Sequence, residues 1–187
     1  RAALGVTQIL AGREIDFDIH TALEAAIGLL PDGVRPSGDA RQSLVGELLA
    51  FIAGRLRVQL MDAGYRYDVV DAVLAEQAHN PHLAQLAVAQ LSRWVKRADW
   101  SPTLAAYSRC VRITRDQKQT YAVSAEKLVE PAEKVLFASM EIATAMPPSS
   151  IDAFFDKLLP MIPAISKFFD DVLVMAEDQV LRENRLG

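Results

Sequence analysis

The sequence predicts an all-α fold, and three observations support that class. Apolar residues recur at helical rather than strand spacing in almost every segment. Ala and Leu, both good helix formers, dominate the segment interiors of a chain that is 51% hydrophobic. No pair of alternating strands joined by a hairpin turn is present. We therefore expect a helical bundle of about seven to nine helices, long enough at 187 residues for one or two domains.

The N-terminal part reads as five helices separated by turn signals. The turn at 31–33 ends the second helix, and Gly64 is placed to stop the third. Asn80 followed by Pro81 offers an N-cap with proline at the first helical position. The expected helices cover about 2–12, 18–30, 40–63, 67–78 and 81–97.

Two of these helices carry clear apolar positions that we expect to face a core. On the long helix at about 40–63 the expected inward positions are Leu44, Leu48, Phe51, Ile52, Leu56 and Leu60. On the helix at about 67–78, which has Asp68 near its start, they are Val69, Val70, Val73 and Leu74.

The C-terminal part continues with further helices. Ser101-Pro102 predicts a helix over about 102–116, and a near match to a capping box at 124–127 predicts another beginning there. A break at 146–150 leaves Ser150 to cap the next helix. The region 151–181 contains two prolines, so it is either two helices or one kinked helix. The helix beginning at 124 should turn inward Leu128, Val135, Leu136 and Met140.

Composition excludes some classes of protein. No apolar run reaches the roughly 18 residues of a membrane span, so no membrane partner is expected. The first residues become charged too soon for a secretory signal. The single cysteine, Cys110, has no partner for an internal disulfide. We therefore expect a cytoplasmic protein.

The chain lacks the patterns of a self-contained active site. His79 and His82 have no neighbouring cluster that would complete a metal ligand set. Cys110 lies among apolar residues and arginines, which favours a buried small residue over a nucleophile. Adjacent carboxylates such as Asp170 and Asp171 point about 100° apart on a helix. No glycine-rich phosphate loop is present. We expect no catalytic residue, no metal and no cofactor in this segment.

Positive charge is concentrated in one short region. The formal net charge is −4, yet residues 91–120 carry seven basic and two acidic residues, while the flanking regions are acidic. A local positive field is what a phosphate backbone senses. The basic residues are Arg93, Lys96, Arg97, Arg109, Arg112, Arg115 and Lys118.

Spacing adds to this signal. Arg109, Arg112 and Arg115 are three residues apart and lie along one helix face. Arginine beside aromatic rings is suited to RNA phosphates and unpaired bases. The alternative is a solvated basic face whose aromatic neighbours belong to the core. The possible stacking groups are Trp94, Trp100 and Tyr107.

The C-terminal residues 168–186 read FFDDVLVMAEDQVLRENRL. This stretch closely resembles the C-terminal part of the beta subunit of bacterial heterotetrameric glycyl-tRNA synthetase, whose pattern is FFD-x-V-x-VM-x-x-D-x-x-LR-x-NRL. Residues 1–6, RAALGV, and residues 54–57, GRLR, resemble further family patterns in the same order. Arg109 with Ile113 fits part of the family's anticodon-binding helix, although Arg112 replaces a commonly uncharged residue.

The resemblance implies a role in attaching glycine to its tRNA. In that family the separate alpha subunit activates glycine with ATP, so the expected partners are glycine tRNA and the alpha subunit. The last part would resemble the anticodon-binding domain of arginyl-tRNA synthetases. We expect a helical region at 1–85 and an anticodon-binding domain at 86–187, truncated at its C-terminus.

The resemblance also adds arginines to the candidate set. Arg55 and Arg57 match the family but face different ways on a helix, which leaves one of them for a structural role. Arg182 and Arg185 also match, and either contact RNA or interact with the helix dipole, Glu177 and Asp178. The competing hypothesis is a helical scaffold that braces the beta subunit or contacts the alpha subunit without binding tRNA. An exposed apolar patch over residues 1–60 would favour it.

Overall fold

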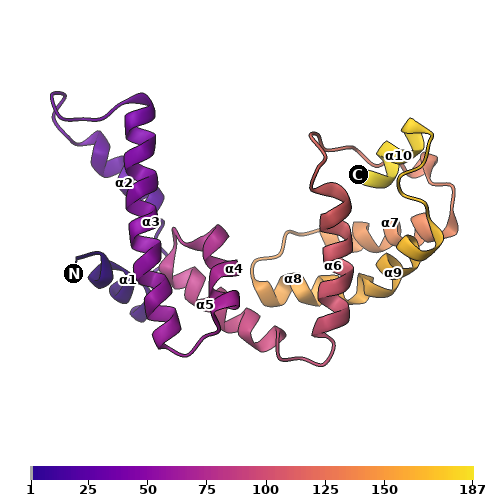
Figure 1. Ribbon diagram of the computed structural model, residues 1–187, viewed down its shortest axis with the longest axis horizontal. Coiled ribbons are helices and arrows are strands. Elements are labelled where there is room, and N and C mark those ends of the chain that lie inside the picture. The colour runs from indigo at the N-terminus through magenta and orange to yellow at the C-terminus, as the bar shows by residue number, and fades with distance from the viewer. Residues whose placement is uncertain (1) are drawn as a thin grey trace. The chain divides into compact units, whose positions relative to one another are not determined.

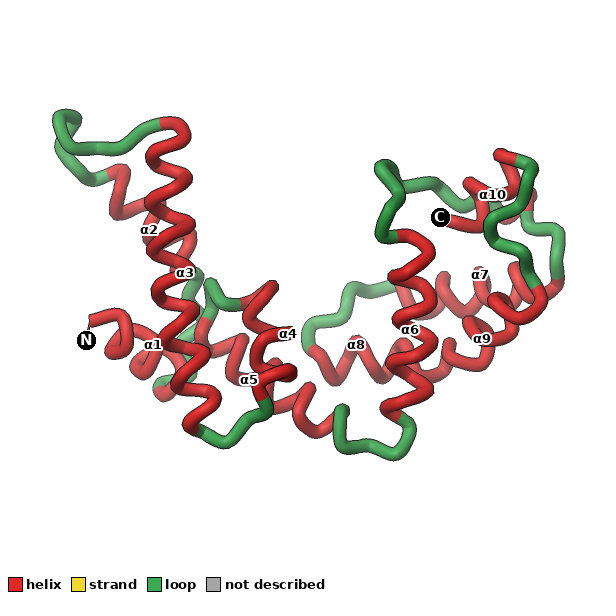
Figure 2. Tube along the Cα trace, in the orientation of Figure 1, coloured by secondary structure: helices red, strands yellow, loops and turns green. Residues whose placement is uncertain are grey.

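The structure is a computed structural model that describes residues 2–187, and within them all regular secondary structure is helical (Figures 1 and 2). The predicted all-α class is confirmed. Contacts between residues divide the chain into two compact units, Arg1–Val95 and Lys96–Gly187, called unit 1 and unit 2 below. The domain boundary expected near residue 85 stays a prediction; residue 85 lies within the helix Pro81–Trp94 of unit 1.

The described residues of unit 1 form five helices. They are α1 (Ala2–Gly12), α2 (Ile19–Gly28), α3 (Gly38–Asp62), α4 (Tyr67–Gln77) and α5 (Pro81–Trp94). The long helix α3 packs against α1, α2 and α4, while α5 packs against α1 and α4 (Figure 1). Buried Leu10, Ile19 and Ile52 form a core cluster between the first three helices.

The predicted turn chemistry of unit 1 is confirmed at two places. Asn80 caps α5, because its side-chain oxygen accepts the backbone N–H of Leu83 at 3.1 Å. Gly64 follows the end of α3 with a φ of +90°, a conformation that favours glycine. Both signals depend on a few neighbouring residues, so the sequence alone predicts them.

The apolar face expected on α3 is wrong in part. Ile52, Leu56 and Leu60 are buried as expected, but Leu44 and Phe51 are exposed by 36% and 50%. Val45 is buried in their place. The core-facing stripe therefore lies about 100° around the helix from Leu44, where α1, α2 and α4 meet α3.

Unit 2 contains five α-helices and two single 3-10 turns among the residues described. They are α6 (Trp100–Thr114), η1 (Ala125–Lys127), α7 (Pro131–Thr144), α8 (Ile151–Leu158), η2 (Leu159–Met161), α9 (Ile162–Asp171) and α10 (Gln179–Leu186). Helix α9 packs against α6 and α7 (Figure 1). The core cluster holds Ala132, Phe168, Val172 and Val174.

The helix expected to begin near residue 124 begins at Pro131 instead. Residues Ala125–Lys127 form only the turn η1, and α7 starts after a capping box made by Glu130 and Glu133. The usual box has Ser or Thr at its first position, so a box that begins with glutamate gives no such signal in the sequence. Val135, expected to face inward, is 53% exposed.

The C-terminal region is partly extended. Ser150 caps α8 as predicted, accepting the backbone N–H of Ala153 at 3.1 Å. The 3-10 turn η2, which contains Pro160, separates α8 from α9, and Pro163 lies in the first turn of α9. The region around these prolines therefore forms two helices. Residues 172–178 are not helical, and a new helix, α10, begins after the cap Asp178. Extended backbone lets Val172 and Val174 both reach the core cluster.

Candidate nucleic-acid interface

Arg109 of helix α6 contacts helix α9, although its side chain remains 41% exposed. Its guanidinium carbon lies 4.7 Å from the ring centroid of Phe169. Two of its nitrogens donate to one carboxylate oxygen of Asp170, each at 3.3 Å. Both partners belong to α9, so Arg109 joins two helices of unit 2 and its charge is balanced.

The remaining cations at the end of α6 are exposed. We call Arg112, Arg115 and Lys118 the α6 basic cluster. The Nε of Arg112 donates to the carbonyl of Ser108 at 3.2 Å, which leaves the rest of the guanidinium exposed. The side chain of Arg115 is 66% exposed and lies 3.6 Å from Asp116. Arg115 and Lys118 follow the last residue of α6, so the cluster continues from the helix into the next segment.

Three further basic residues lie at the end of α5 or between α5 and α6, namely Arg93, Lys96 and Arg97. Arg97 forms a two-bond fork with Asp99, at 2.8 and 2.7 Å. The hydrogen bond from Arg97 holds the pKa of Asp99 below its ordinary value. Lys96 and Arg97 are exposed and belong to unit 2, whereas Arg93 lies in the last turn of α5 in unit 1. Arg97 therefore brings a charge that is already paired.

The three aromatic candidates differ in accessibility. Trp94 is 6% exposed, so its ring offers no face on which a base could stack. Trp100 packs edge-to-face on Phe155, with centroids 5.4 Å apart. Tyr107 is 45% exposed and forms an edge-to-face pair with Phe154, with centroids 6.3 Å apart. Of the three rings, Tyr107 is the most exposed, while Trp100 is half-buried.

Arg55 and Arg57 lie on α3 in unit 1. Arg57 is bound to Asp71 of α4 by two hydrogen bonds, of 2.6 and 3.1 Å. It thus ties α3 to α4. Arg55 lies over the exposed ring of Phe51, 3.8 Å from its centroid, and forms part of the α3 surface. The expectation that one of the two is structural fits this arrangement.

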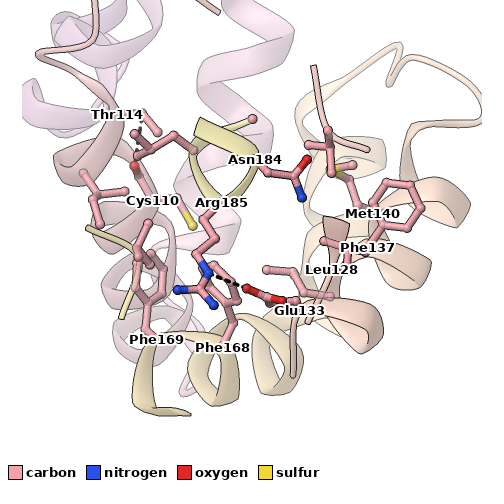
Figure 3. Close-up of a pocket in the computed structure, with 16 residues that line it drawn as sticks. Cys110, Thr114, Leu128, Glu133, Phe137, Met140, Phe168, Phe169, Asn184 and Arg185 are labelled. Carbon is pink, nitrogen blue, oxygen red and sulfur yellow. Dashed lines mark hydrogen bonds and ion pairs between the residues drawn. The ribbon is translucent and has the colours of Figure 1, made fainter. Parts of the chain in front are cut away.

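The C-terminal residues Asn184, Arg185 and Leu186, called the C-terminal clamp below, point into unit 2. The Arg185 guanidinium forms a buried ion pair with Glu133 of α7, and its Nη1 donates to the carbonyl of Leu173 at 3.0 Å (Figure 3). The side chains of Arg185 and Glu133 are 7% and 1% exposed. Arg182 donates to the carbonyl of Ala176.

The pairing of Arg182 and Arg185 with Glu177 and Asp178, which the sequence allowed, is therefore not what forms. The sequence could not reveal the partner, because Glu133 is 52 residues away from Arg185. The clamp explains the NRL pattern as a structural element of unit 2, with its arginine inside the fold.

Glu133 is held in its charged form by its neighbours. Burial, the largest single influence, raises the pKa of this carboxyl group. The backbone N–H of Glu130, the Arg185 side chain and the backbone N–H of Val129 together outweigh it, so the pKa lies below its ordinary value. The two N–H groups donate to Glu133 Oε2 at 2.7 and 2.6 Å.

An apolar pocket of about 180 Å³ lies beside this ion pair, between α6, α7, α9 and α10. Figure 3 shows the Glu133–Arg185 pair with Phe168 and Phe169 beside it. Among the described residues lining the pocket, Glu133 and Arg185 are the charged ones, and they neutralise each other. The pocket therefore presents no unpaired positive charge to a phosphate.

Other chemistry is not supported by the arrangement of side chains. Within residues 2–187 no three His, Cys, Asp or Glu side chains gather as a metal site. Burial raises the pKa of the Cys110 thiol, more than nearby Arg109 lowers it, which disfavours the nucleophilic thiolate. None of the helices in the described part of the chain combines the length and apolar character of a bilayer crossing.

Known proteins resemble this chain over its whole length. A family model described as glycyl-tRNA synthetase beta subunit matches residues 1–75. The glycine–tRNA ligase beta subunit of Myxococcus xanthus is 32% identical over 198 residues, covering 100% of this chain and 28% of that subunit.

The corresponding subunits of Haemophilus influenzae and Geotalea daltonii are each 29% identical, covering 100% of this chain and 27% of their own length. The chain thus spans just over a quarter of the relatives it matches. These relatives bear out the family that the C-terminal pattern had indicated, and the chain belongs to the glycyl-tRNA synthetase beta subunit family.

Proposed function

We propose that this chain is a tRNA-recognition segment of a glycyl-tRNA synthetase beta subunit, and that the α6 basic cluster contacts tRNA phosphates. In the complete enzyme it would support ATP-dependent attachment of glycine together with the alpha subunit. The segment itself contributes binding and no catalytic residue or cofactor site. We also propose that this surface reads the anticodon.

The observation that carries the proposal is the exposure of the α6 basic cluster. Arg109 and Arg97 are matched by Asp170 and Asp99, so they add little net field. Arg112 and Lys118 have no salt bridge within residues 2–187, and Arg115 has only its exposed neighbour Asp116. Three exposed cations in seven residues leave a local positive surface on a chain of net charge −4. Exposed Tyr107 on the same helix adds a ring for base stacking.

Reversing two charges of the cluster tests this proposal. We expect Arg112→Glu with Arg115→Glu to weaken binding of glycine tRNA by at least about tenfold. Each phosphate contact releases counterions, so the slope of log affinity against log salt should become shallower by about 0.7–0.9 per lost contact. Fluorescence titration at two or more salt concentrations measures both quantities.

A matched control separates local contacts from total charge. Arg13→Glu with Arg66→Glu changes the net charge equally on exposed positions of unit 1. Equal weakening by the two double variants would show that only overall charge matters, and would refute the assignment to α6. Repeating the titration with an anticodon-swapped tRNA tests anticodon reading.

A second candidate function is a scaffold that braces the beta subunit or contacts the alpha subunit. The exposed side of α3 favours it. Leu44, Phe51 and Val58 follow one another at intervals of seven residues and are exposed by 36%, 50% and 55%. Half-buried Leu48 lies in the same stripe, which is the spacing of a helix that pairs with another helix.

Charge introduced into this stripe tests the scaffold function. We expect Phe51→Glu with Val58→Glu to abolish any co-elution of the chain with the alpha subunit on size-exclusion chromatography, because a buried charge opposes apolar pairing. Ala50→Glu, exposed on a different side of α3, serves as the control. Complex formation that survives the double variant would exclude the stripe as the contact, and tRNA binding should be unchanged by it.

A further inference from the structure

The segment that follows α6 has little structure of its own. Gln117 still donates its backbone N–H to Thr114 at 2.9 Å, and the next backbone turn begins at Ser124. Among the residues described, positions 118–123 form no backbone–backbone hydrogen bond with one another or with the rest of the chain. Lys118 lies in this stretch, so its position depends on how the two ends of the segment are held.

The far end is held by the side chain of Asn184. The backbone N–H of Ser124 donates to Asn184 Oδ1 at 2.6 Å, and Asn184 Nδ2 donates to the Ser124 carbonyl at 3.2 Å. Asn184 is 6% exposed, so these bonds are shielded from water. The side-chain amide of Asn184 thus bonds both the N–H and the carbonyl of Ser124, which fixes the position of that residue.

The end of α10 approaches the same segment closely. A Cβ atom on Gly187 would lie 2.6 Å from the carbonyl oxygen of Tyr121 and 2.9 Å from a methyl group of Val123. The helix is itself anchored, because Asp178 caps its start and Arg185 pairs with Glu133. The clamp is thus a fixed support for residues 121–124.

We infer that Asn184 is a positioning residue for the α6 basic cluster. By fixing Ser124, it restricts the paths open to residues 118–123 and thus the positions that Lys118 can take. Arg112 and Arg115 are held by α6 itself, since the Arg115 backbone N–H donates to the Val111 carbonyl at 2.9 Å. The entropic cost of ordering residues 118–123 is then incurred when the chain folds, so it does not reduce the affinity for RNA. The inference rests on the proposed function, because it assigns to Asn184 the arrangement of that same surface.

Asn184→Ala removes both hydrogen bonds to Ser124. The variant keeps all three basic residues of the α6 basic cluster, so the charge of the cluster is unchanged. We expect it to weaken binding of glycine tRNA by about three- to tenfold, and to lower the salt slope by about one phosphate contact, 0.7–0.9. Binding is measured at a temperature at which circular dichroism shows both proteins folded.

Thr103→Ala is the matched control. Thr103 is 2% exposed, and its hydroxyl donates to the carbonyl of Asp99 at 2.7 Å, at the opposite end of α6. This variant loses a comparably buried hydrogen bond without touching residues 115–124. We expect Thr103→Ala to lower the melting temperature about as much as Asn184→Ala does. Its affinity for glycine tRNA and its salt slope should stay at the parental values.

A second variant keeps the test independent of folding defects. Inserting two glycines after Gln119 slackens the segment while Asn184 and Ser124 stay bonded, and should give the same loss of affinity and slope. Parental binding by both Asn184→Ala and the insertion would overturn the inference. If Arg112→Glu with Arg115→Glu also binds like the parent, the proposed function fails first and the inference falls with it.

Discussion

Replacing Arg185 by alanine is expected to lower the free energy of unfolding of unit 2 by about 3–5 kcal/mol. The substitution removes one partner of an ion pair whose side chains are 7% and 1% exposed. Glu133 would then keep a buried negative charge with only the backbone N–H groups of Val129 and Glu130 as donors. The carbonyl of Leu173 also loses its donor. Urea unfolding followed by circular dichroism measures the change.

Two comparisons make this result interpretable. Arg112→Ala removes an exposed guanidinium and should leave the unfolding curve nearly unchanged. Glu133→Gln combined with Arg185→Met removes both charges and should recover much of the loss, because no buried charge is left alone. A fall below about 1 kcal/mol for Arg185→Ala would mean that the pair is not buried in solution.

The same pair sets a pH dependence. Because the pKa of Glu133 is lowered on folding, its contribution to stability is present above the ordinary value of 4.5 and is lost as pH falls through the folded value. The difference between the parent and Arg185→Ala should therefore be full at neutral pH and shrink below about pH 4.5. A difference that grows in acid would contradict this assignment.

Replacing Leu56 by alanine is expected to lower the free energy of unfolding of unit 1 by about 2–5 kcal/mol. Leu56 is 0% exposed on α3, the helix that contacts α1, α2 and α4. Truncation loses the transfer free energy of the side chain and leaves a cavity that the helices close only partly. Hydrogen exchange of α3 and α4 amides locates the loss.

The effect should stay within unit 1. Amides of α7 and α9 should keep their protection in Leu56→Ala, because contacts between residues divide the chain at Val95. Val58→Ala on the exposed side of α3 is the control and should cost far less. Equal loss of protection in both units would show that they unfold as one cooperative block.

Local signals in the sequence were read correctly where they act over a few residues. The cap at Asn80, the stop at Gly64 and the cap at Ser150 each depend on neighbours three or fewer positions away, or on one φ angle. The capping box at Glu130 is equally local, but its first residue is not the usual one. The sequence therefore predicts a start for α7 that is seven residues too early.

The spacing of charges in the sequence predicts the basic helix, but it does not tell which of its arginines is paired with an acid. Arg109 and Arg112 are both basic positions on one face of α6, and charge and spacing alone do not distinguish them. In the fold Arg109 pairs with Asp170 and lies over Phe169, which are about 60 residues later, while Arg112 donates to the Ser108 carbonyl of its own helix. Which of the two arginines is paired with an acid is thus decided by the packing of α9 against α6.

The sequence by itself determined the all-helical class, the family and the position of the basic region, because helical periodicity, residue pattern and charge are properties of the chain read in order. Only the tertiary structure decided what the C-terminal pattern does. Arg185 and Asn184 find their partners, Glu133 and Ser124, 52 and 60 residues away. Such pairs form only when packing brings α7, α10 and the segment after α6 together. The physical reason is that burial and pairing depend on distance in space, which separation along the chain does not fix.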